Sequence, residues 1–401
     1  MRAPLPLALY VHLPWCVRKC PYCDFNSHPL PTGGIPRAYL AALLDDLDFA
    51  ARGLEGRELA TIFFGGGTPS LFDATAIGDT VARACRVFSA APDLEVTLEA
   101  NPGTIEHGRF AAFRDAGVTR VSLGAQSFHD TQLAALGRIH SPEETFAAVR
   151  ELAGAGIGNF NLDLMYALPG QTLAQAMRDV ELAIALRPAH VSHYQLTLEP
   201  GTAFARRPPE LPDDDTAYEM QEACQGLLAA AGYPQYEVSA YAPSARRCRH
   251  NLNYWSFGDY VGIGAGAHGK VTDATTGAVL RTARVRNPGR YMTARSPGGR
   301  LEEARTLLPG DVAFEFCLNA LRLVEGFDLR TFEARTGLPR SAIANPLGHA
   351  RARGLMECLP GEHWIPTPQG RRFLNDLQAL FLPEIAREKV VEGLASGDGI
   401  G

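Results

Sequence analysis

The segment Cys16-Val17-Arg18-Lys19-Cys20-Pro21-Tyr22-Cys23 is the most informative stretch of this chain. Its cysteines have the spacing C-x₃-C-x₂-C, so three thiolates on one loop can converge on a metal centre. A structural zinc site usually takes four ligands from paired C-x₂-C units, and no second pair exists here, although His28 could supply a fourth ligand. A disulfide would leave one cysteine over and would need an oxidising compartment. An iron–sulfur cluster fits better, and three cysteines would leave one iron of a [4Fe–4S] cluster with an open, reactive position.

A short apolar segment precedes the cysteines, and similar segments follow along the first half of the chain. Each ends at Gly, Pro or polar residues, which is typical of a buried strand. Helical patterns separate them, and Ser141 with Glu144 and Thr172 with Gln175 form capping-box signals at two helix starts. Alternation of strand and helix requires parallel strands, so the sequence predicts an α/β fold, a partial (β/α)6 TIM-like barrel. The predicted strands are Leu7–Leu13, Ala60–Phe64, Leu94–Ala100, Arg120–Ala125, Asn159–Met165 and His190–Leu196.

Residues at the carboxyl ends of these strands are candidates for a binding site. Gly65-Gly66-Gly67-Thr68-Pro69-Ser70 follows the second strand, and glycine there lets a ligand approach the backbone. Glu99, Gln126 and Asp163 lie at the ends of the next three strands, on the face where barrel active sites are found. Gly264-x-Gly266-x-x-Gly269 matches a dinucleotide fingerprint, but no acidic residue stands about 20 positions further on. We therefore interpret that stretch as a tight segment that closes the barrel.

The length and the changes of pattern predict three parts: a core part-barrel at 1–233, a bridging segment at 234–300 and a winged-helix-like domain at 301–401. The bridging segment ends in a Pro- and Gly-containing linker at Asn287–Arg300. The last part has a slight acidic excess, so packing or docking is a better interpretation than DNA binding. Its predicted helices are Asp311–Leu323, Asp328–Thr336, Ser341–Leu355 and Gln369–Phe381, and its strands are Met356–Leu359 and His363–Pro366.

Composition excludes several classes of protein. The chain has 401 residues, a formal net charge of −6, and 46% hydrophobic residues, which suits a packed protein without a broad nucleic-acid-binding surface. No run of 18 apolar residues exists, so we expect no membrane span. The apolar N-terminus, Met1–Val11, is interrupted by prolines and has no small-residue cleavage site, unlike a signal peptide. We expect a cytoplasmic protein whose cysteines lie in a reducing compartment.

A C-x₃-C-x₂-C loop directly after a first strand, with Tyr22 before the last cysteine, resembles the radical S-adenosylmethionine (SAM) superfamily. In that superfamily the open iron chelates the amino and carboxylate groups of SAM, and an electron from the cluster cleaves SAM to a radical. The resemblance implies a [4Fe–4S] cluster on Cys16, Cys20 and Cys23, with Arg138 at the SAM carboxylate. The SAM-binding residues that it implies are Tyr10, Tyr22, Gly66, Gly67, Thr68, Glu99, Gln126, Arg138 and Asp163.

Longer segments narrow the resemblance to the oxygen-independent coproporphyrinogen III oxidase family, over nearly the whole chain. The oxidase branch of that family carries a fourth cysteine, as C-x₃-C-x₂-C-x-C, and a long N-terminal extension. Here Phe25 stands at the position of the fourth cysteine, and only nine residues precede Tyr10. The segments that carry the resemblance are Tyr10–Cys16, Gly65–Ser70, Glu99–Pro102, Ser122–Ser127, Asp163–Gly170 and Asn319–Arg322.

The second branch, the HemW-type haem chaperones, has Cys-Asp-Phe and a His-Asn-x-x-Tyr-Trp motif. This chain has Cys23-Asp24-Phe25 and His250-Asn251-Leu252-Asn253-Tyr254-Trp255. Because a neutral imidazole is a common axial haem ligand and aromatic rings offer flat apolar faces, we expect His250, Tyr254 and Trp255 to bind haem. Neighbouring Arg246, Arg247 and Arg249 could pair the haem propionates or form a solvated patch, and Cys248 is an alternative ligand.

The sequence therefore predicts a radical SAM-type haem chaperone that binds a [4Fe–4S] cluster, SAM and haem. It would deliver haem to acceptor proteins, such as membrane cytochromes or respiratory enzymes, and would not bind nucleic acid. Two alternatives stay open: a coproporphyrinogen III dehydrogenase that decarboxylates two propionates, and an interaction protein with a purely structural cluster. The sequence does not decide whether the chain is an enzyme.

Overall fold

The computed structural model describes residues 5–103 and 108–383. Its main feature is a 12-stranded sheet in which six strands of the first half run parallel, in chain order, as the sequence predicts. The predicted strand bounds are confirmed to within about two residues, except that β5 begins at Ser89 rather than Leu94. The parallel strands are β1 (Leu7–Leu13), β4 (Glu58–Gly66), β5 (Ser89–Ala100), β6 (Arg120–Gln126), β7 (Phe160–Tyr166) and β8 (His190–Gln195).

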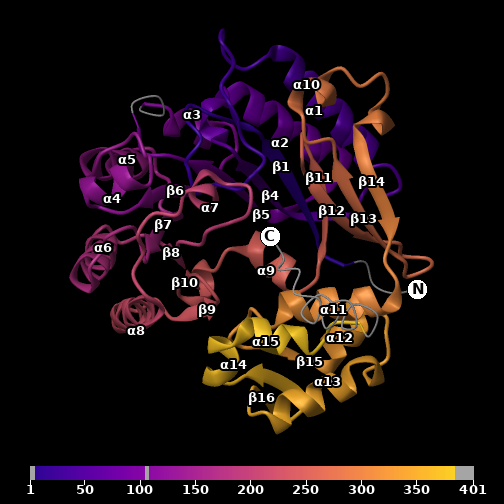
Figure 1. The fold of residues 1–401 in the computed structure, drawn as a ribbon. Helices are drawn as coiled ribbons and strands as arrows, with labels where there is room; N and C mark the ends of the chain where they lie inside the picture. The colour runs from indigo at the N-terminus through magenta and orange to yellow at the C-terminus, as the bar shows by residue number, and fades with distance from the viewer. Residues whose placement is uncertain (1–4, 104–107, 384–401) are drawn as a thin grey trace.

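Helices cover the outer face of these strands (Figure 1). Both predicted capping boxes are present: Ser141 and Glu144 bond each other's backbone N–H groups, and so do Thr172 and Gln175. No helix among the described residues is long and apolar enough to cross a membrane. The helices are α1 (Arg37–Ala50), α2 (Ala74–Val87), α3 (Phe110–Asp115), α4 (Asp130–Ala135), α5 (Pro142–Gly154), α6 (Leu173–Ala185), α7 (Ala203–Arg206) and α8 (Asp214–Ala230).

The bridging segment extends the sheet beyond β1, and this corrects the expectation that it closes the barrel. β11 (Asp259–Ile263) pairs with β1 in parallel, and β12 (His268–Thr272), β13 (Val279–Arg284) and β14 (Leu301–Thr306) follow antiparallel. Gly264 has φ +97°, and a Cβ there would lie 2.3 Å from the carbonyl oxygen of His12, so the glycine-containing stretch is a tight turn packed on β1. The expected linker forms α10 (Pro288–Met292) and η3 (Pro297–Arg300), which pack on α1.

At its other edge the sheet adds β10 (Ala240–Tyr241) and β9 (Gln235–Glu237), and η2 (Ser244–Arg246) leads into α9 (Arg249–Trp255). Because β14 and β9 are the two ends of the strand order, the barrel stays open. Figure 1 shows α9 between the sheet and the helices of the C-terminal part. Helix α9 carries the His-Asn-x-x-Tyr-Trp motif, which therefore lies between the sheet and the C-terminal part.

The C-terminal part has its own apolar core, in which Phe316 packs edge-on against Phe257, Phe327 and Phe332. Helices followed by a β-wing agree with the expected winged-helix-like arrangement, while Leu301–Thr306 belong to the large sheet as β14. Its elements are α11 (Pro309–Ala320), β15 (Phe327–Asp328), α12 (Leu329–Thr336), α13 (Ser341–Ala352), β16 (Met356–Leu359), β17 (His363–Pro366), α14 (Pro368–Arg372) and α15 (Leu374–Ala379).

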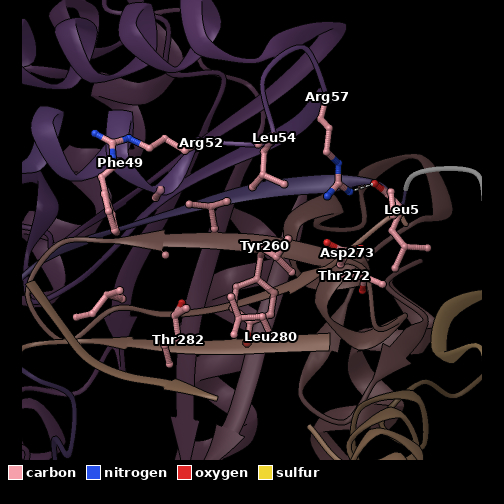
Figure 2. A pocket seen from close by; sticks show the side chains of 18 of the residues that line it. Leu5, Phe49, Arg52, Leu54, Arg57, Tyr260, Thr272, Asp273, Leu280 and Thr282 are labelled. Carbon is pink, nitrogen blue, oxygen red and sulfur yellow. Dashed lines mark hydrogen bonds between the residues drawn. The ribbon is translucent and has the colours of Figure 1, made fainter. Parts of the chain in front are cut away.

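A cavity of about 630 Å³ lies between the end of α1 and the antiparallel strands of the extension (Figure 2). Its wall is mainly apolar, and two of its arginines, the half-buried Arg57 and the buried Arg284, have carboxylate partners inside the protein. Arg57 pairs with Asp259 at 3.0 Å, and Arg284 pairs with Asp46 at 2.9 Å. With these charges already paired and no cysteine or histidine in its lining, this cavity is not where the predicted chemistry lies.

Candidate functional site

The cysteine loop lies over the carboxyl ends of the parallel strands. It leaves β1 through β2 (Trp15–Cys16) and returns at β3 (His28–Pro29), which pairs with β2. Cys16, Cys20 and Cys23 are free thiols that line one cavity of about 340 Å³. No three His, Cys, Asp or Glu side chains in the described ranges stand close enough to hold a single metal ion. In a [4Fe–4S] cluster each cysteine would bind a different iron, so three cluster ligands need not meet at one metal ion.

Polar groups surround the thiols on the cavity side. Arg138 points a guanidinium N–H at Cys20 Sγ, at 3.9 Å, and Ser27 Oγ lies 3.9 Å from Cys23 Sγ. Burial raises the pKa of the Cys16 and Cys23 thiols. Thiolates buried in this way need a cation to be stable, and iron ions of a cluster would supply one.

The glycine-rich segment fixes the start of the cysteine loop. Gly67 N–H donates to the carbonyl of Leu13 at 2.9 Å, and Thr68 N–H donates to that of Trp15 at 2.8 Å. A Cβ on Gly67 would lie 2.5 Å from the Trp15 carbonyl oxygen, so only glycine allows this approach. Gly66 N–H donates to Glu99 at 3.2 Å. All three N–H groups are therefore used inside the protein, and the Thr68 hydroxyl already accepts from Asn101 Nδ2 at 2.9 Å.

Two half-buried carboxyl groups, Glu99 of β5 and Asp163 of β7, face the cavity. Burial, reinforced by the charge of Asp163, raises the pKa of Glu99 to about 8. Burial also raises the pKa of Asp163, although Ser122 Oγ and Asn161 Nδ2 donate to it at 3.0 and 2.8 Å. The two groups thus differ in character, because Glu99 is mainly protonated at neutral pH and can donate a hydrogen bond.

Arg138 and Gln126 meet at the carboxyl end of β6. Arg138 donates to the Gly124 carbonyl at 2.7 Å, while its Nε is buried without a partner. Gln126 has φ +65°, a strained conformation for a side chain of this kind, and accepts from Tyr194 Oη at 2.9 Å. A Cβ on Gly124 would lie 2.9 Å from the Gln126 amide and 3.3 Å from the Arg138 guanidinium. Glycine at this position therefore makes room for both side chains.

The two tyrosines of the predicted SAM set lie in different places. Tyr22 lines the cavity and packs against Phe204, with ring centroids 6.4 Å apart. Tyr10 is not in the lining: its hydroxyl bonds His12 Nδ1 at 3.0 Å, and its ring stacks on Phe63. Tyr10 therefore lies behind the glycine segment, where it supports the wall of the cavity.

Several lining residues were not singled out from the sequence. Tyr194 and Ser192 point into the lumen from β8, and their spacing of two is the signal that could have identified them. Other lining residues missed as site residues are Asn101, Arg120, Ser122, Asn161 and Asn251. Polar residues that face a barrel lumen alternate along the strand in the same way as the solvent-facing residues of any half-buried strand. The sequence pattern alone therefore does not distinguish lumen-facing from solvent-facing polar residues.

The motif on α9 is divided between two environments. His250 is buried, its Nδ1 bonds Thr61 Oγ1 at 2.9 Å, and burial lowers its pKa to about 3, so the ring is neutral. The Tyr254 hydroxyl accepts from Tyr260 at 3.3 Å, and the Trp255 ring lies 4.3 Å from the Arg322 guanidinium carbon. Among the motif residues, only Asn251 joins the lining of the cysteine cavity. The structure therefore does not bring His250, Tyr254 and Trp255 to one common surface.

The basic residues before the motif have partners inside the protein. Arg247 pairs with Glu325 at 2.6 Å and Arg249 with Asp93 at 2.8 Å. Cys248 is buried, and its thiol points at Glu95 at 3.8 Å. Arg246 lines a wide surface groove on this side of the sheet. Neither a free cationic patch for propionates nor an open thiol is present at Arg247, Cys248 and Arg249.

Comparisons with known proteins agree with this geometry. The sequence model of the Radical SAM superfamily matches residues 10–183, and that of the HemN C-terminal domain matches residues 307–373. The chain is 49% identical over 381 residues to the heme chaperone HemW of Escherichia coli K12, covering 94% of this chain and 99% of that protein. It is 45% identical over 383 residues to the heme chaperone HemW of Haemophilus influenzae, covering 94% and 98%.

Among solved structures, coproporphyrinogen III oxidase (HemN) from Escherichia coli, a radical SAM enzyme, superposes with a TM-score of 0.77. The match covers 94% of this chain and 90% of that chain at 21% identity, so this likeness concerns the fold. Barrel, cysteine loop and C-terminal part together define a protein of the radical SAM class with a HemN-type C-terminal domain. Identity to two HemW proteins over nearly their full length then decides the family. The chain belongs to the HemW family.

Proposed function

We propose that Cys16, Cys20 and Cys23 hold a [4Fe–4S] cluster and that SAM binds beside it in the same cavity. The convergence of three free thiols on one cavity carries the proposal. The buried Nε of Arg138, which has no partner, supports it further, because such a group is expected where a ligand completes the site. When bound, the cluster and SAM supply one-electron cleavage chemistry.

The residues of the chain have distinct tasks in this proposal. Arg138 offers positive charge beside Cys20 to the carboxylate of SAM. Glu99, protonated at neutral pH, donates a hydrogen bond, whereas Asp163 accepts one. Tyr22, Gln126 and the Gly66–Thr68 backbone shape the wall around the adenosine, and Tyr10 supports that wall from behind.

The same proposal makes the chain a haem carrier that delivers haem to acceptor proteins from the cytoplasm. The two relatives named above are heme chaperones, and each match covers 94% of this chain. Phe25 lies 60% exposed at the mouth of the cavity, where a dehydrogenase of the related branch would carry a further cysteine. The cavity of about 340 Å³ has many polar side chains in its lining and is of a size for SAM rather than for SAM together with a tetrapyrrole. Haem would therefore bind outside it.

For the haem ligand we retain His250, and we retain Tyr254 and Trp255 of the same motif as further haem-binding residues. A neutral imidazole is the form that coordinates iron, and the low pKa of His250 ensures that form. Haem ligation at this residue requires α9 to move, because His250 is 7% exposed. Haem titration of His250→Ala, followed in the Soret band, should show at least about tenfold weaker binding. An unchanged titration would place the ligand elsewhere.

Replacement of the three loop cysteines tests the cluster. The triple Ala variant, reconstituted anaerobically, should lose iron–sulfur absorbance near 400 nm and SAM binding by calorimetry. Cys358→Ala is the matched control, since this exposed thiol in the wing should leave both signals intact. Retained cluster in the triple variant would overturn the assignment.

Assays of haem transfer, coproporphyrinogen III turnover and SAM binding on the same reconstituted wild-type sample distinguish the haem carrier from the two alternative functions. Haem transfer to an apo-acceptor without protoporphyrinogen formation agrees with the carrier. Turnover of coproporphyrinogen III would instead identify a dehydrogenase, and a cluster without SAM binding would indicate an interaction protein with a structural cluster.

A further inference from the structure

A buried arginine without a partner lies at the floor of the cysteine cavity. Arg120 is 2% exposed and begins β6, whereas Gln126 ends that strand at the mouth of the barrel. At about 3.3 Å per residue, their Cα atoms are about 20 Å apart. Arg120 therefore belongs to the end of the lumen opposite the cysteines, yet its side chain reaches the same cavity.

The guanidinium of Arg120 makes no hydrogen bond or ion pair with any residue in 5–103 or 108–383, and its Nε is buried. The carboxylates around it are engaged elsewhere. Glu95 accepts from the His250 N–H at 3.1 Å, and Asp163 accepts from Ser122 and Asn161. Because a buried charge without a hydrogen-bonding partner is costly, this arrangement is expected where a ligand supplies the partner.

A second uncommitted donor stands at the same floor. Asn251 of α9 lines the cavity, and its side-chain amide makes no hydrogen bond with the described residues. Thr97, the neighbour of Arg120 in the strand register, is fully buried, and its hydroxyl also lacks a partner. Three elements, β5, β6 and α9, thus bring unpaired polar groups to one end of the lumen.

We propose that Arg120 and Asn251 bind the carboxylate of a small organic acid at the floor of the barrel. A guanidinium matches a carboxylate with two parallel hydrogen bonds, and the amide adds a neutral donor. A doubly charged phosphate fits less well, because the carboxyl groups of Glu95 and Asp163 already lie near Arg120. Held at the floor, the acid directs its other end toward the cysteine loop.

Titration of acetate into the full-length protein, at constant ionic strength and without SAM, tests this site. Wild type should bind acetate saturably by calorimetry. Arg120→Met should weaken acetate binding at least about tenfold, which is the loss expected for a charged hydrogen bond. Asn251→Asp should also abolish binding, because the new carboxylate occupies Arg120 from within the protein. Arg178→Met, on the surface of α6, is the control and should bind like wild type.

The proposal would be overturned if Arg120→Met and wild type bound acetate equally well. It would also be overturned if wild type bound chloride or phosphate as tightly as acetate, or if saturating SAM displaced the acetate. If Arg120→Met fails to fold, acetate binding by Asn251→Asp tests the site instead, and unchanged binding by that variant would overturn the proposal. The inference does not rest on the cluster or on haem. The triple cysteine variant should therefore still bind acetate, which distinguishes failure of this site from failure of the proposed function.

Discussion

At the scale of single residues, Glu99 shows how position alone tunes a carboxyl group. It lies near the carboxyl end of β5, accepts one backbone hydrogen bond from Gly66 and faces Asp163 across the lumen. Burial and the neighbouring charge both favour its neutral form, and its pKa rises to about 8. Asp163 has more hydrogen-bond donors around it, which favour its ionised form.

Glu99→Gln should therefore change how stability depends on pH. Below about pH 4.5 the carboxyl is protonated in both the folded and the unfolded chain. Between that pH and about 8, only the unfolded chain loses the proton, so the free energy of unfolding of wild type falls as pH rises. The glutamine variant lacks this decline. Since one pKa unit corresponds to about 1.4 kcal/mol, the variant should be more stable than wild type by a few kcal/mol at pH 8.

Urea unfolding of the apo-protein at several pH values measures this difference. A stability difference that stays constant from pH 4.5 to pH 8 would contradict the raised pKa. Glu181→Gln on the exposed face of α6 is the control, because it removes one surface carboxyl group that pairs with Arg178.

Residue chemistry was easier to predict from the sequence than residue geometry. The spacing of Cys16, Cys20 and Cys23 indicates a shared centre, and the structure places the three thiols around one cavity. Their role as cluster ligands stays a prediction. The sequence did not indicate Arg120 and Asn251. Their distinguishing feature is a side chain without a hydrogen-bonding partner, and only the folded chain shows which polar groups lack one.

At the scale of elements, α9 depends on a residue far away in the sequence. The helix is only seven residues long, too short to be stable alone. Glu95 of β5 accepts from the N–H groups of Arg249 and His250, at 3.3 and 3.1 Å, and so caps the helix from the barrel floor. Its negative charge also suits the positive end of the helix dipole.

Glu95→Ala should consequently cost about 2–3 kcal/mol of stability, because it leaves buried N–H donors without an acceptor. Glu95→Gln keeps an acceptor and should cost less. The midpoints of urea unfolding of the two variants, each compared with wild type, measure this difference in stability. An alanine variant no less stable than the glutamine variant would show that the cap contributes nothing.

Local signals explain which elements could be predicted. The parallel strands and the capped helices have patterns contained within a few residues, so their bounds agree with the structure. The pairing of β11 with β1 joins segments about 250 residues apart, and nothing within Asp259–Ile263 specifies that partner. The sequence therefore indicated a bridging segment there but not the extension of the sheet.

At the scale of the whole molecule, α9 connects the barrel floor to the C-terminal part. On one side His250 reaches Thr61 of β4, and on the other Trp255 packs under Arg322, just after α11. Arg322 also bonds Glu237 at 3.2 Å, and Glu237 is 2% exposed. One arginine thus contacts the His-Asn-x-x-Tyr-Trp motif and the sheet edge from the C-terminal part.

Arg322→Ala tests this connection. It removes the cation from the Trp255 ring and leaves the Glu237 carboxylate with only Ser239 as a side-chain donor, so we expect a loss of about 1–3 kcal/mol. Arg322→Lys should restore little, because an ammonium cannot stack on the ring and bond the carboxylate as a planar guanidinium does.

The readout must distinguish a loosened interface from general instability. Trp255 emission, identified by subtracting the Trp255→Phe spectrum, should shift to longer wavelength in Arg322→Ala under native conditions, because the ring gains water. Arg340→Ala is the matched control: its pairs with Glu333 and Glu362 are exposed, so it should cost less than about 1 kcal/mol and leave the emission unchanged. A lower urea midpoint without the emission shift would mean that Arg322 stabilises the fold without connecting α9 to the C-terminal part.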